Sequence, residues 1–297
     1  MYDKHLESFF FVAQMGSFSS AAEKLYVSRT ALIQQINLLE SRIGAQLFKR
    51  NSKGVTLTEA GTYFLSEAKH IMNISRRTIE RCRSMQDETA VRIGILPNLK
   101  SPLLTKICAL FTARYPQTSI RFVECHLKDY FKNFEEGKFD ITVDYIAGYI
   151  YDHPDYRVQK LCEDRHCCGI PQGHSLSGKN SVTLADLNGQ GIMMYSRGIT
   201  KADDRLRDYL LRTVPDIDII GIDTYDISLS MKCELSNHIL IYYSMYRNNF
   251  SPLITVPLEL GMDFPIEIGI GYMADSPQTV LRFIDVVKSA YQKDGAQ

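Results

Sequence analysis

The chain has 297 residues and a formal net charge of zero, because 34 Lys and Arg balance 34 Asp and Glu. This balance excludes a uniformly polycationic protein, and a hydrophobic content of 45% is sufficient for two or three packed domains. The N-terminus lacks the apolar core of a signal peptide, and no apolar run approaches the ~20 residues of a membrane span, so we expect a cytoplasmic protein without a membrane partner.

Two short amphipathic helices are predicted at the start of the chain. An apolar stripe over residues 6–13 marks the first helix. The second helix covers residues 19–25, and Ser19 or Ser20 can cap it by accepting a hydrogen bond from a free N–H of its first turn. We expect Phe18 to pack into the core that these helices share.

A third helix is predicted over residues 29–43, with Ser28 as its N-cap and Gly44 as its end. Its buried face is formed by Leu32, Ile36, Leu39 and Ile43. The opposite face carries Arg29, Thr30, Ile33, Gln34 and Asn37, which together with Ser28 are the candidate DNA contacts of this helix. Such groups suit base edges, because arginine pairs with guanine, an amide with adenine, and an apolar branch with the thymine methyl. We interpret the last two helices as a DNA-reading helix-turn-helix; the alternative is an ordinary amphipathic helix pair.

A basic loop and a short strand follow the helix-turn-helix. Residues 49–54 read KRNSKG, and residues 55–57 form the strand, which is the layout of a wing. Arg50 and Lys53 are expected to reach phosphates or the minor groove. Residues 1–58 hold seven Lys and Arg against four Asp and Glu, a local net charge of +3 that favours phosphate contact over mere solubility.

A long helix is predicted from Thr58, its cap, to about residue 88. A stripe of apolar and small residues runs along it and indicates pairing with another helix. The stripe consists of Phe64, Ala68, Ile71, Ser75, Ile79, Cys82 and Met85. The alternative is that this stripe packs against its own domain. Residues 85–89 are expected to form a hinge.

From residue 91 onward, strands alternate with helices, which predicts parallel strands joined by right-handed crossovers. The first part has expected strands at 91–96, 119–124 and 139–145 and helices at 101–115 and 127–137. The second part, from about residue 162, has strands at 166–170, 192–195, 217–222 and 239–242 and helices at 202–213 and 225–235. A strand at 265–272 and a helix at 277–292 complete the pattern.

Four blocks of this sequence resemble the winged helix-turn-helix of LysR-type transcriptional regulators. They read LESFFFVA from Leu6, GSFSSAAEKL from Gly16, LESRIGAQLFKR from Leu39 and LTEAG from Leu57. The segments RIGILP, LFTARYP and EEGKFDITV resemble the first half of that family's effector domain more loosely. Two positions depart from the family pattern. Ile33 stands where the family usually has Ser, and Gln34 where it often has Arg, which implies a shifted base preference.

The resemblance implies a fold class: α/β, with an all-α-dominated winged helix-turn-helix head, a long dimerisation helix and a two-lobed periplasmic-binding-protein-like effector domain. The DNA-binding domain would cover residues 1–58, the dimerisation helix and hinge residues 59–89, and the effector domain residues 90–297. Lobe I would comprise about residues 90–161 plus 265–297, and lobe II about residues 162–264. The implied partners are double-stranded DNA with an inverted repeat, a small-molecule effector, and further copies of the chain in a dimer or tetramer, with no cofactor.

The candidate effector-binding residues lie where strands of a two-lobed α/β fold end and helices begin, which is the usual ligand site of such folds. They are Asn98, Lys100, Ser101, Tyr145, Arg197, Thr200, Tyr225 and Tyr243. Ser101 can donate to an anion and Arg197 can clamp a carboxylate, whereas the tyrosines favour an aromatic ligand. A small carboxylate or aromatic molecule is therefore expected. The alternative for each residue is a solvated turn or a core aromatic.

The seven cysteines form no Cys-x-x-Cys pair, so we expect free thiols in a reducing compartment. Cys167 and Cys168 are adjacent on a predicted strand and should point to opposite faces, which disfavours a shared metal ion. No nucleophile elbow, HExxH motif or phosphate loop indicates an enzyme. Two hypotheses stand beside a regulator: a solute-binding module without DNA binding, and a thiol redox sensor that uses Cys162, Cys167 or Cys168.

Overall fold

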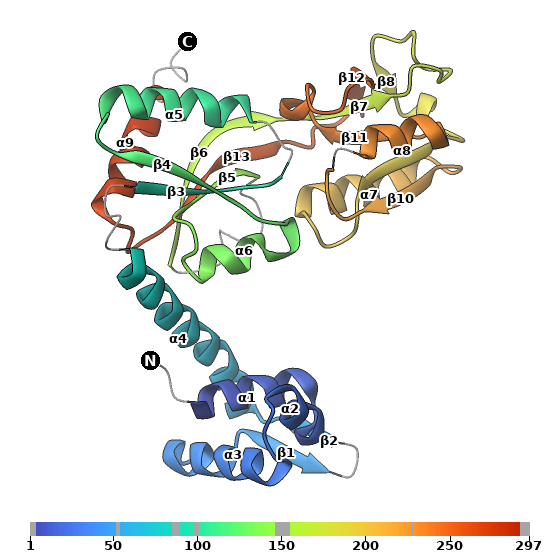
Figure 1. Cartoon of the computed structure of the whole chain (residues 1–297). Helices are drawn as coiled ribbons and strands as arrows, with labels where there is room; N and C mark the ends of the chain where they lie inside the picture. The colour runs from blue at the N-terminus through green and yellow to red at the C-terminus, as the bar shows by residue number, and fades with distance from the viewer. Residues whose placement is uncertain are drawn as a thin grey trace. The chain divides into compact units, whose positions relative to one another are not determined.

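The structure is a computed structural model, which describes residues 4–51, 54–84, 90–97, 101–145, 155–226 and 228–291 (Figure 1). The chain forms two compact units: Met1–Met85 with Glu135–Gly137, and the remaining residues. Among the described helices, none combines the length and the apolar character that a membrane crossing requires.

Three helices build the head of the first unit: α1 (Lys4–Met15), α2 (Phe18–Lys24) and α3 (Arg29–Ile43). α2 begins one residue earlier than predicted, and the Ser17 hydroxyl caps it by accepting from the Ser20 N–H at 3.4 Å. The predicted caps, Ser19 and Ser20, lie inside the helix, so that prediction is wrong. The early start brings Phe18, which is 5% exposed, into the head core from the first turn.

The ends of α3 agree with the prediction. The Ser28 hydroxyl accepts a hydrogen bond from the Ala31 N–H at 3.1 Å, which satisfies one of the free donors of the first turn. Gly44 ends the helix with a φ of 76°, in the left-handed region that glycine adopts without a steric penalty.

The buried face of α3 is shorter than predicted. Leu32, Ile36 and Leu39 are buried in the head core, but Ile43 is 40% exposed, so the prediction for this residue is wrong. Leu39 is the last residue that α3 contributes to the head core, and the helix continues for about one more turn to Ile43.

The wing is an antiparallel hairpin of β1 (Phe48–Asn51) and β2 (Gly54–Leu57). The sequence predicted only the second strand, because adjacent basic residues carry little strand signal. Lys49 and Arg50, which were expected in a loop, pair with β2. Lys53, at the predicted tip, lies outside the described residues.

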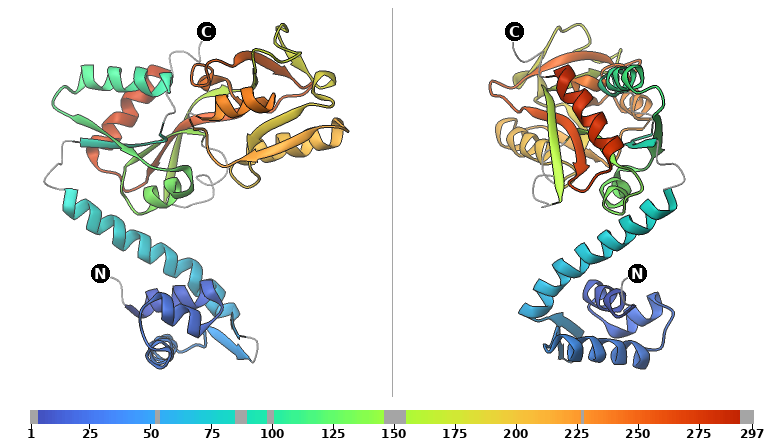
Figure 2. Two further views of the ribbon diagram at one scale, coloured as in Figure 1. Left: turned by 45° about the vertical axis from the view of Figure 1, so that its right-hand side comes forward. Right: turned by 90° about the vertical axis from the view of Figure 1, so that its left-hand side faces the viewer.

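A single long helix, α4 (Glu59–Ser84), follows the wing (cyan in Figure 2). Thr58 caps it as predicted: its hydroxyl accepts from the Gly61 N–H at 2.9 Å and donates to the Gln46 carbonyl at 2.7 Å. The predicted hinge, residues 85–89, lies outside the described residues.

The stripe that was predicted along α4 divides between two environments. Ala68 of the stripe is buried in the head core, together with Met72 from outside the stripe, so this part of the helix packs against its own domain. Ile71 of the stripe is 48% exposed, and Tyr63 and Ile74, which the stripe did not include, are 72% and 41% exposed. At 100° per residue these three side chains lie within about 80° of one another, so they form one outward face.

The first sheet of the second unit has five strands in the order β4-β3-β5-β13-β6. They are β3 (Ala90–Ile95), β4 (Ser119–Glu124), β5 (Ile141–Tyr145), β6 (Tyr156–Asp164) and β13 (Ile266–Met273). β3 is parallel to β4 and β5, as the alternation predicts, whereas β13 runs antiparallel to β5 and β6. The helices of this part are α5 (Pro102–Arg114), α6 (Leu127–Glu135) and α9 (Gln278–Tyr291).

The second sheet has six strands in the order β10-β9-β11-β7-β12-β8. They are β7 (His166–Ile170), β8 (Val182–Thr183), β9 (Gly191–Tyr195), β10 (Asp218–Ile222), β11 (Ile239–Tyr243) and β12 (Ile254–Glu259). The helices are α7 (Lys201–Thr213) and α8 (Leu229–Ser236). α8 starts later than predicted, because the Asp226 carboxylate accepts from the Ser228 N–H at 2.8 Å and forms a turn before the helix.

The chain passes between the two sheets twice, at Arg165 between β6 and β7 and again between β12 and β13. A single apolar cluster spans both sheets: it contains Leu240 of β11 and Ile268 of β13, with Leu103 of α5 packed against it. The head, the long helix and these two lobes confirm the predicted fold class.

Candidate nucleic-acid interface and effector site

α3 presents a polar face to solvent. Arg29, Thr30, Gln34 and Asn37, four of the predicted base-reading residues, are exposed, and so is Ser28 at the start of the helix. Their donors and acceptors lie outside the packed core, so these side chains are available for base edges or phosphates.

Ile33 has a different environment from the other residues on this face. It is half-buried and packs against the head core. Only part of the side chain is left for a thymine methyl, so Ile33 has a packing role in addition to the predicted base contact.

Arg50 of the wing contacts α3. Its Nη2 donates to Asn37 Oδ1 at 2.6 Å and lies 3.5 Å from Glu40 Oε2. Its guanidinium carbon is 5.0 Å from the centroid of the Phe18 ring, within the range of a cation–π contact. The Arg50 side chain is still 39% exposed, so the guanidinium can also reach a phosphate.

Glu40 joins α3 to the backbone of the wing. Its Oε1 accepts from the N–H groups of Leu47 at 2.7 Å and Phe48 at 3.0 Å. Its side chain is only 13% exposed. The sequence analysis did not select Glu40, because a carboxylate that meets backbone donors seven and eight residues later leaves no periodic signal.

Ser101 is the N-cap of α5 in the first lobe, and Thr200 is the N-cap of α7 in the second lobe. The Ser101 hydroxyl accepts from a backbone N–H of α5 at 3.2 Å, and the Thr200 hydroxyl accepts from the Asp203 N–H at 3.0 Å. Leu103 of α5 packs against the apolar cluster that contains Ala202 of α7. The starts of α5 and α7 therefore converge on the cluster that the two lobes share.

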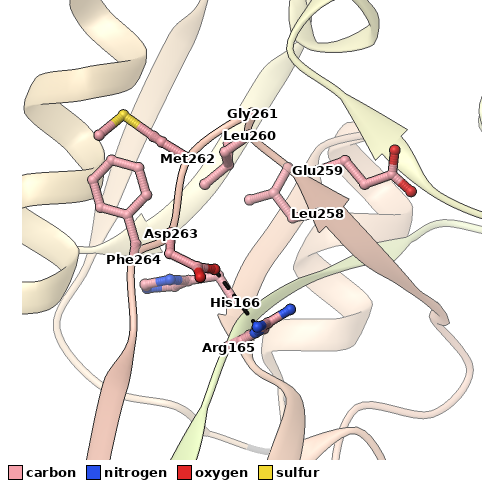
Figure 3. A pocket seen from close by; sticks show the side chains of 9 residues that line it. All are labelled: Arg165, His166, Leu258, Glu259, Leu260, Gly261, Met262, Asp263 and Phe264. Atoms are coloured by element: carbon pink, nitrogen blue, oxygen red, sulfur yellow. Dashed lines mark ion pairs between the residues drawn. The ribbon is translucent and has the colours of Figure 1, made fainter.

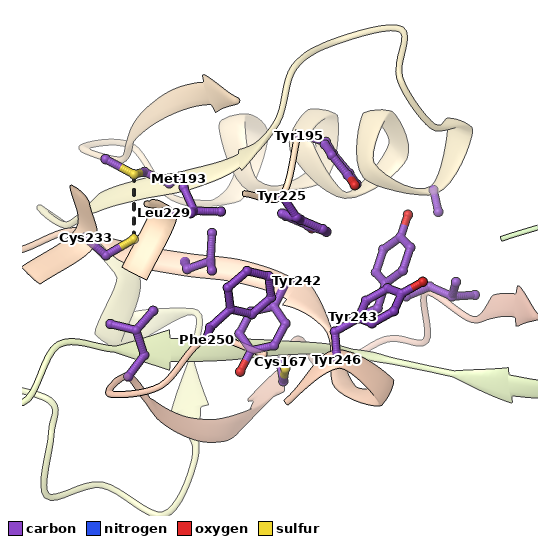
Figure 4. Packing of buried hydrophobic residues seen from close by; sticks show 14 of the residues in the cluster. Cys167, Met193, Tyr195, Tyr225, Leu229, Cys233, Tyr242, Tyr243, Tyr246 and Phe250 are labelled. Atoms are coloured by element: carbon purple, nitrogen blue, oxygen red, sulfur yellow. Dashed lines mark hydrogen bonds between the residues drawn. The ribbon is translucent and has the colours of Figure 1, made fainter. Parts of the chain in front are cut away.

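A tyrosine-rich cluster fills the second lobe beside these helix starts (Figure 4). Tyr225 and Tyr243 are 2% and 3% exposed, and the rings of Tyr195 and Tyr225 stack with centroids 4.1 Å apart. Burial raises the pKa of Tyr225 and Tyr243 well above the ordinary value. Tyr242 and Tyr246 are buried as well. These tyrosines pack as core aromatics, which is the alternative that the sequence left open.

A buried polar network, which the sequence analysis missed, surrounds Asp203 in the first turn of α7. Its Oδ2 accepts from the Tyr243 hydroxyl at 2.7 Å and from the Thr200 hydroxyl, and its Oδ1 lies 3.1 Å from His166 Nε2. The side chains of Asp203 and His166 are 0% and 2% exposed. A carboxylate of the protein itself thus occupies the N-terminus of α7.

Of the other predicted effector residues, the structure describes only the side chain of Arg197, which pairs within its own lobe. Arg197 Nη2 donates to Asp208 at 2.6 Å, and this hydrogen bond raises the pKa of Arg197. The Arg197 side chain therefore lies against its own lobe. Asn98 and Lys100 lie outside the described residues, and so does the side chain of Tyr145.

A cavity of about 390 Å³ lies beside the two crossover segments (Figure 3). Arg165, His166 and residues 258–264 line it, and Arg165 forms an exposed ion pair with Asp263 at 3.7 Å. The sequence analysis selected none of these residues for effector binding. His166 belongs both to the cavity wall and to the Asp203 network, so a molecule in the cavity would lie next to the network that holds the start of α7.

The buried thiols of β7 are poorly suited to redox chemistry. Cys167 packs into the tyrosine-rich cluster and Cys168 into the core on the other face of the sheet, so the two point apart as predicted. Burial raises the pKa of Cys167 to about 12 and that of Cys168 well above the ordinary value, which disfavours the reactive thiolate. In the part of the chain that the structure describes, no group of three His, Cys, Asp or Glu side chains could hold a metal ion.

An exposed recognition helix, a wing held against it and a two-lobed α/β unit together define a helix-turn-helix regulatory protein with a ligand-binding domain. Comparison with known families agrees. Residues 4–62 match the bacterial regulatory helix-turn-helix protein model of the lysR family, and residues 85–292 match the LysR substrate binding domain. The chain belongs to the LysR family of bacterial regulators.

Relatives and solved structures extend this result. The Hca operon transcriptional activator HcaR of Escherichia coli (strain K12) is 30% identical over 187 residues, which are 63% of this chain and 62% of HcaR. BudR of Raoultella terrigena, an HTH-type transcriptional regulator, is 28% identical over 62% of this chain and 64% of its own length. The match thus spans less than two thirds of these relatives.

Two full-length crystal structures share the fold. CbnR, a LysR family transcriptional regulator, superimposes with a TM-score of 0.56 at 18% identity, over 98% of this chain and 99% of CbnR. Full-length BenM superimposes with a TM-score of 0.54 at 23% identity, over 100% of this chain and 99% of BenM.

The environments of the cysteines predict their reactivity. In the native protein, iodoacetamide should label the exposed Cys162, whereas Cys167, Cys168 and Cys233 should be labelled only after unfolding, because burial excludes the reagent and disfavours the thiolate. Mass spectrometry of labelled peptides measures each site. Native labelling of Cys167 as fast as that of Cys162 would contradict the structure and revive the redox-sensor hypothesis.

Proposed function

We propose that the chain is a LysR-type transcriptional regulator whose DNA binding is controlled by a small-molecule effector. Residues 1–58 bind the operator, residues 59–89 pair two chains, and residues 90–297 bind the effector. The observation that carries the proposal is the exposed polar face of α3, which is joined to the basic wing through Arg50 and Glu40. Such a regulator works in the cytoplasm, where it meets DNA.

The DNA-binding domain contacts bases through α3 and phosphates through the wing. Arg29, Thr30, Ile33, Gln34 and Asn37 face base edges from α3, and Arg50 and Lys53 reach phosphates from the wing. CbnR, which resembles this chain in fold with a TM-score of 0.53, is known in complex with its target DNA. A solute-binding module without DNA binding would leave the exposed face of α3 without a use, so we rank it second.

The outward face of α4 supports pairing of two chains through this helix. Tyr63, Ile71 and Ile74 expose apolar surface on one side of a long helix, which a second copy can cover. A two-fold dimer presents two recognition helices, and such a pair reads an inverted repeat on double-stranded DNA. Two dimers can associate into a tetramer on longer sites.

Effector control rests on the two lobes of residues 90–297, lobe I being about 90–161 plus 265–297 and lobe II about 162–264. A ligand that binds one arrangement of the lobes more tightly shifts the population toward that arrangement. A small carboxylate fits the start of α5, where Ser101 can donate a hydrogen bond. The start of α7 suits it less, because the Asp203 carboxylate already lies there.

DNA binding is tested on duplexes from the region upstream of the chain's own gene or a neighbouring gene. Binding should weaken with salt, and Lys53→Ala should weaken binding to all sequences and lower the salt slope by about 1. Gln34→Ala should instead relax the preference at one base pair, because it removes a base contact. Quantitative gel-shift titrations at several salt concentrations measure both effects. No salt-dependent binding by the wild-type protein, or equal losses at every base pair for both variants, would refute the assignment.

Pairing through α4 is tested by sedimentation of the full chain. Replacing Ile71 and Ile74 together by Lys should raise the dissociation constant of the dimer at least about 30-fold, because two apolar contacts worth roughly 1–2 kcal/mol each are lost. Lys69→Glu changes a charge elsewhere on the same helix and serves as the control. An unchanged mass for the double variant would exclude this face as the interface.

Effector binding is tested by thermal unfolding against a panel of small carboxylates and aromatics. A true effector at about 100 times its dissociation constant stabilises the protein by about 2.7 kcal/mol, which raises the Tm by about 5–10 °C. Ser101→Ala should reduce that shift if a carboxylate binds at the start of α5. An effector whose stabilisation is unaffected by Ser101→Ala would place the ligand elsewhere, and the cavity beside Arg165 would then be the next site to examine.

A further inference from the structure

The contact between Arg50 and Asn37 determines which way the Asn37 amide faces. An asparagine amide has an oxygen that accepts and an NH₂ group that donates, and either can point outward from a helix. The guanidinium of arginine contains only donors, so a contact at 2.6 Å from Arg50 Nη2 requires the amide oxygen of Asn37. The chemistry of the arginine thus settles the orientation, which atomic positions alone leave ambiguous.

Three contacts keep Arg50 in position for this role. In addition to its hydrogen bond with Asn37, the Arg50 guanidinium lies 3.5 Å from the Glu40 carboxylate and over the Phe18 ring. Glu40 is itself held by two backbone N–H groups of the wing, and Phe18 is 5% exposed in the head core. An exposed ion pair alone would be weak. Here the guanidinium is held by an anchored carboxylate, an anchored ring and the amide together.

The outward group of Asn37 is therefore its NH₂. Adenine in the major groove offers an acceptor at N7 and a donor at N6, so the usual asparagine–adenine pair needs both ends of the amide. Guanine offers two acceptors, N7 and O6, which an NH₂ group alone can contact. Because Arg50 draws the Asn37 oxygen toward the wing, the NH₂ group is the freer end of the amide and favours the second kind of contact, although the oxygen keeps a second lone pair.

We propose that Arg50 is a specificity-determining residue, which orients Asn37 to read guanine and not adenine. This inference rests on the proposed DNA-binding function. It also corrects the general expectation from the sequence that an amide on this face selects adenine. Arg50 can still contact a phosphate, because its contacts with Asn37 and Glu40 both use Nη2, which leaves the three N–H groups of Nε and Nη1, and its side chain is 39% exposed.

The test compares base preferences of full-length variants. The wild-type protein selects binding sites from a random duplex library at fixed salt, and each variant is then titrated against the selected duplex and its single-base variants. Asn37→Ala identifies the base pair that Asn37 reads, because the preference there should fall by about tenfold. We expect that base to be guanine, and its replacement by 7-deazaguanine should weaken binding of the wild-type protein but not of Asn37→Ala.

Two further variants test the orientation. Arg50→Met keeps an apolar stem over Phe18 but removes the donors, so the amide can turn and adenine should be accepted at this position about as well as guanine. Asn37→Asp presents only acceptors, so guanine should be disfavoured and cytosine, with its N4 amino group, preferred. Lys53→Ala is the charge-matched control for Arg50→Met: it removes one wing charge, leaves Arg50 in place, and should lower affinity without changing the preference.

The results distinguish a failure of the proposed DNA-binding function from a failure of the proposal that Arg50 orients Asn37. If the wild-type protein selects no sequence and shows no salt-dependent binding, the proposed function fails. If it selects a site but Asn37→Ala changes no base preference, or the base read is adenine, or Arg50→Met leaves the guanine preference intact, the inference fails while the function stands. Thermal unfolding of each variant shows that the head remains folded; if the Tm of Arg50→Met falls, Arg50→Leu, which also lacks donors, replaces it.

Discussion

The head depends on the carboxylate of Glu40. It accepts from two backbone N–H groups where the chain leaves α3 for β1, and it lies beside Arg50 of the same strand. An unsatisfied donor in this partly buried turn would cost roughly 1–3 kcal/mol, so the carboxylate fixes where the wing begins relative to α3. Because β1 carries Arg50 and α3 carries Asn37, the residues proposed to contact phosphates and bases are positioned by the same group.

Asp203 has a comparable position in the second unit. The Tyr243 hydroxyl of β11, the Thr200 hydroxyl before α7 and His166 of β7 all meet this one buried carboxylate. Removing one of these partners would leave a buried oxygen of Asp203 without that hydrogen bond, which costs roughly 1–3 kcal/mol, so each contact helps to link two strands to the start of α7. His166 also borders the cavity at the crossovers, which gives a ligand there a direct contact with this network.

The sequence predicts the parts of this structure that depend on short-range order. The ends of α3 follow from Ser28 and Gly44, and its buried residues up to Leu39 follow from helical periodicity. What it misses depends on partners distant in the chain. The strand around Arg50 exists because β2 pairs with it, and no local pattern indicates that Glu40 accepts from backbone N–H groups beside the wing or that Asp203 accepts from Tyr243.

Base preference in this head is therefore a property of α3 and the wing together. Gln34 lies one turn before Asn37 on the same exposed face, and an amide that can turn freely can meet the donor and acceptor of adenine at once. Asn37 has the same functional group, but the arginine beside it draws the oxygen toward the wing, so the donors are the freer end of the amide. Two amides on one helix face can thus read different bases, and the difference is set by a residue that lies outside the helix.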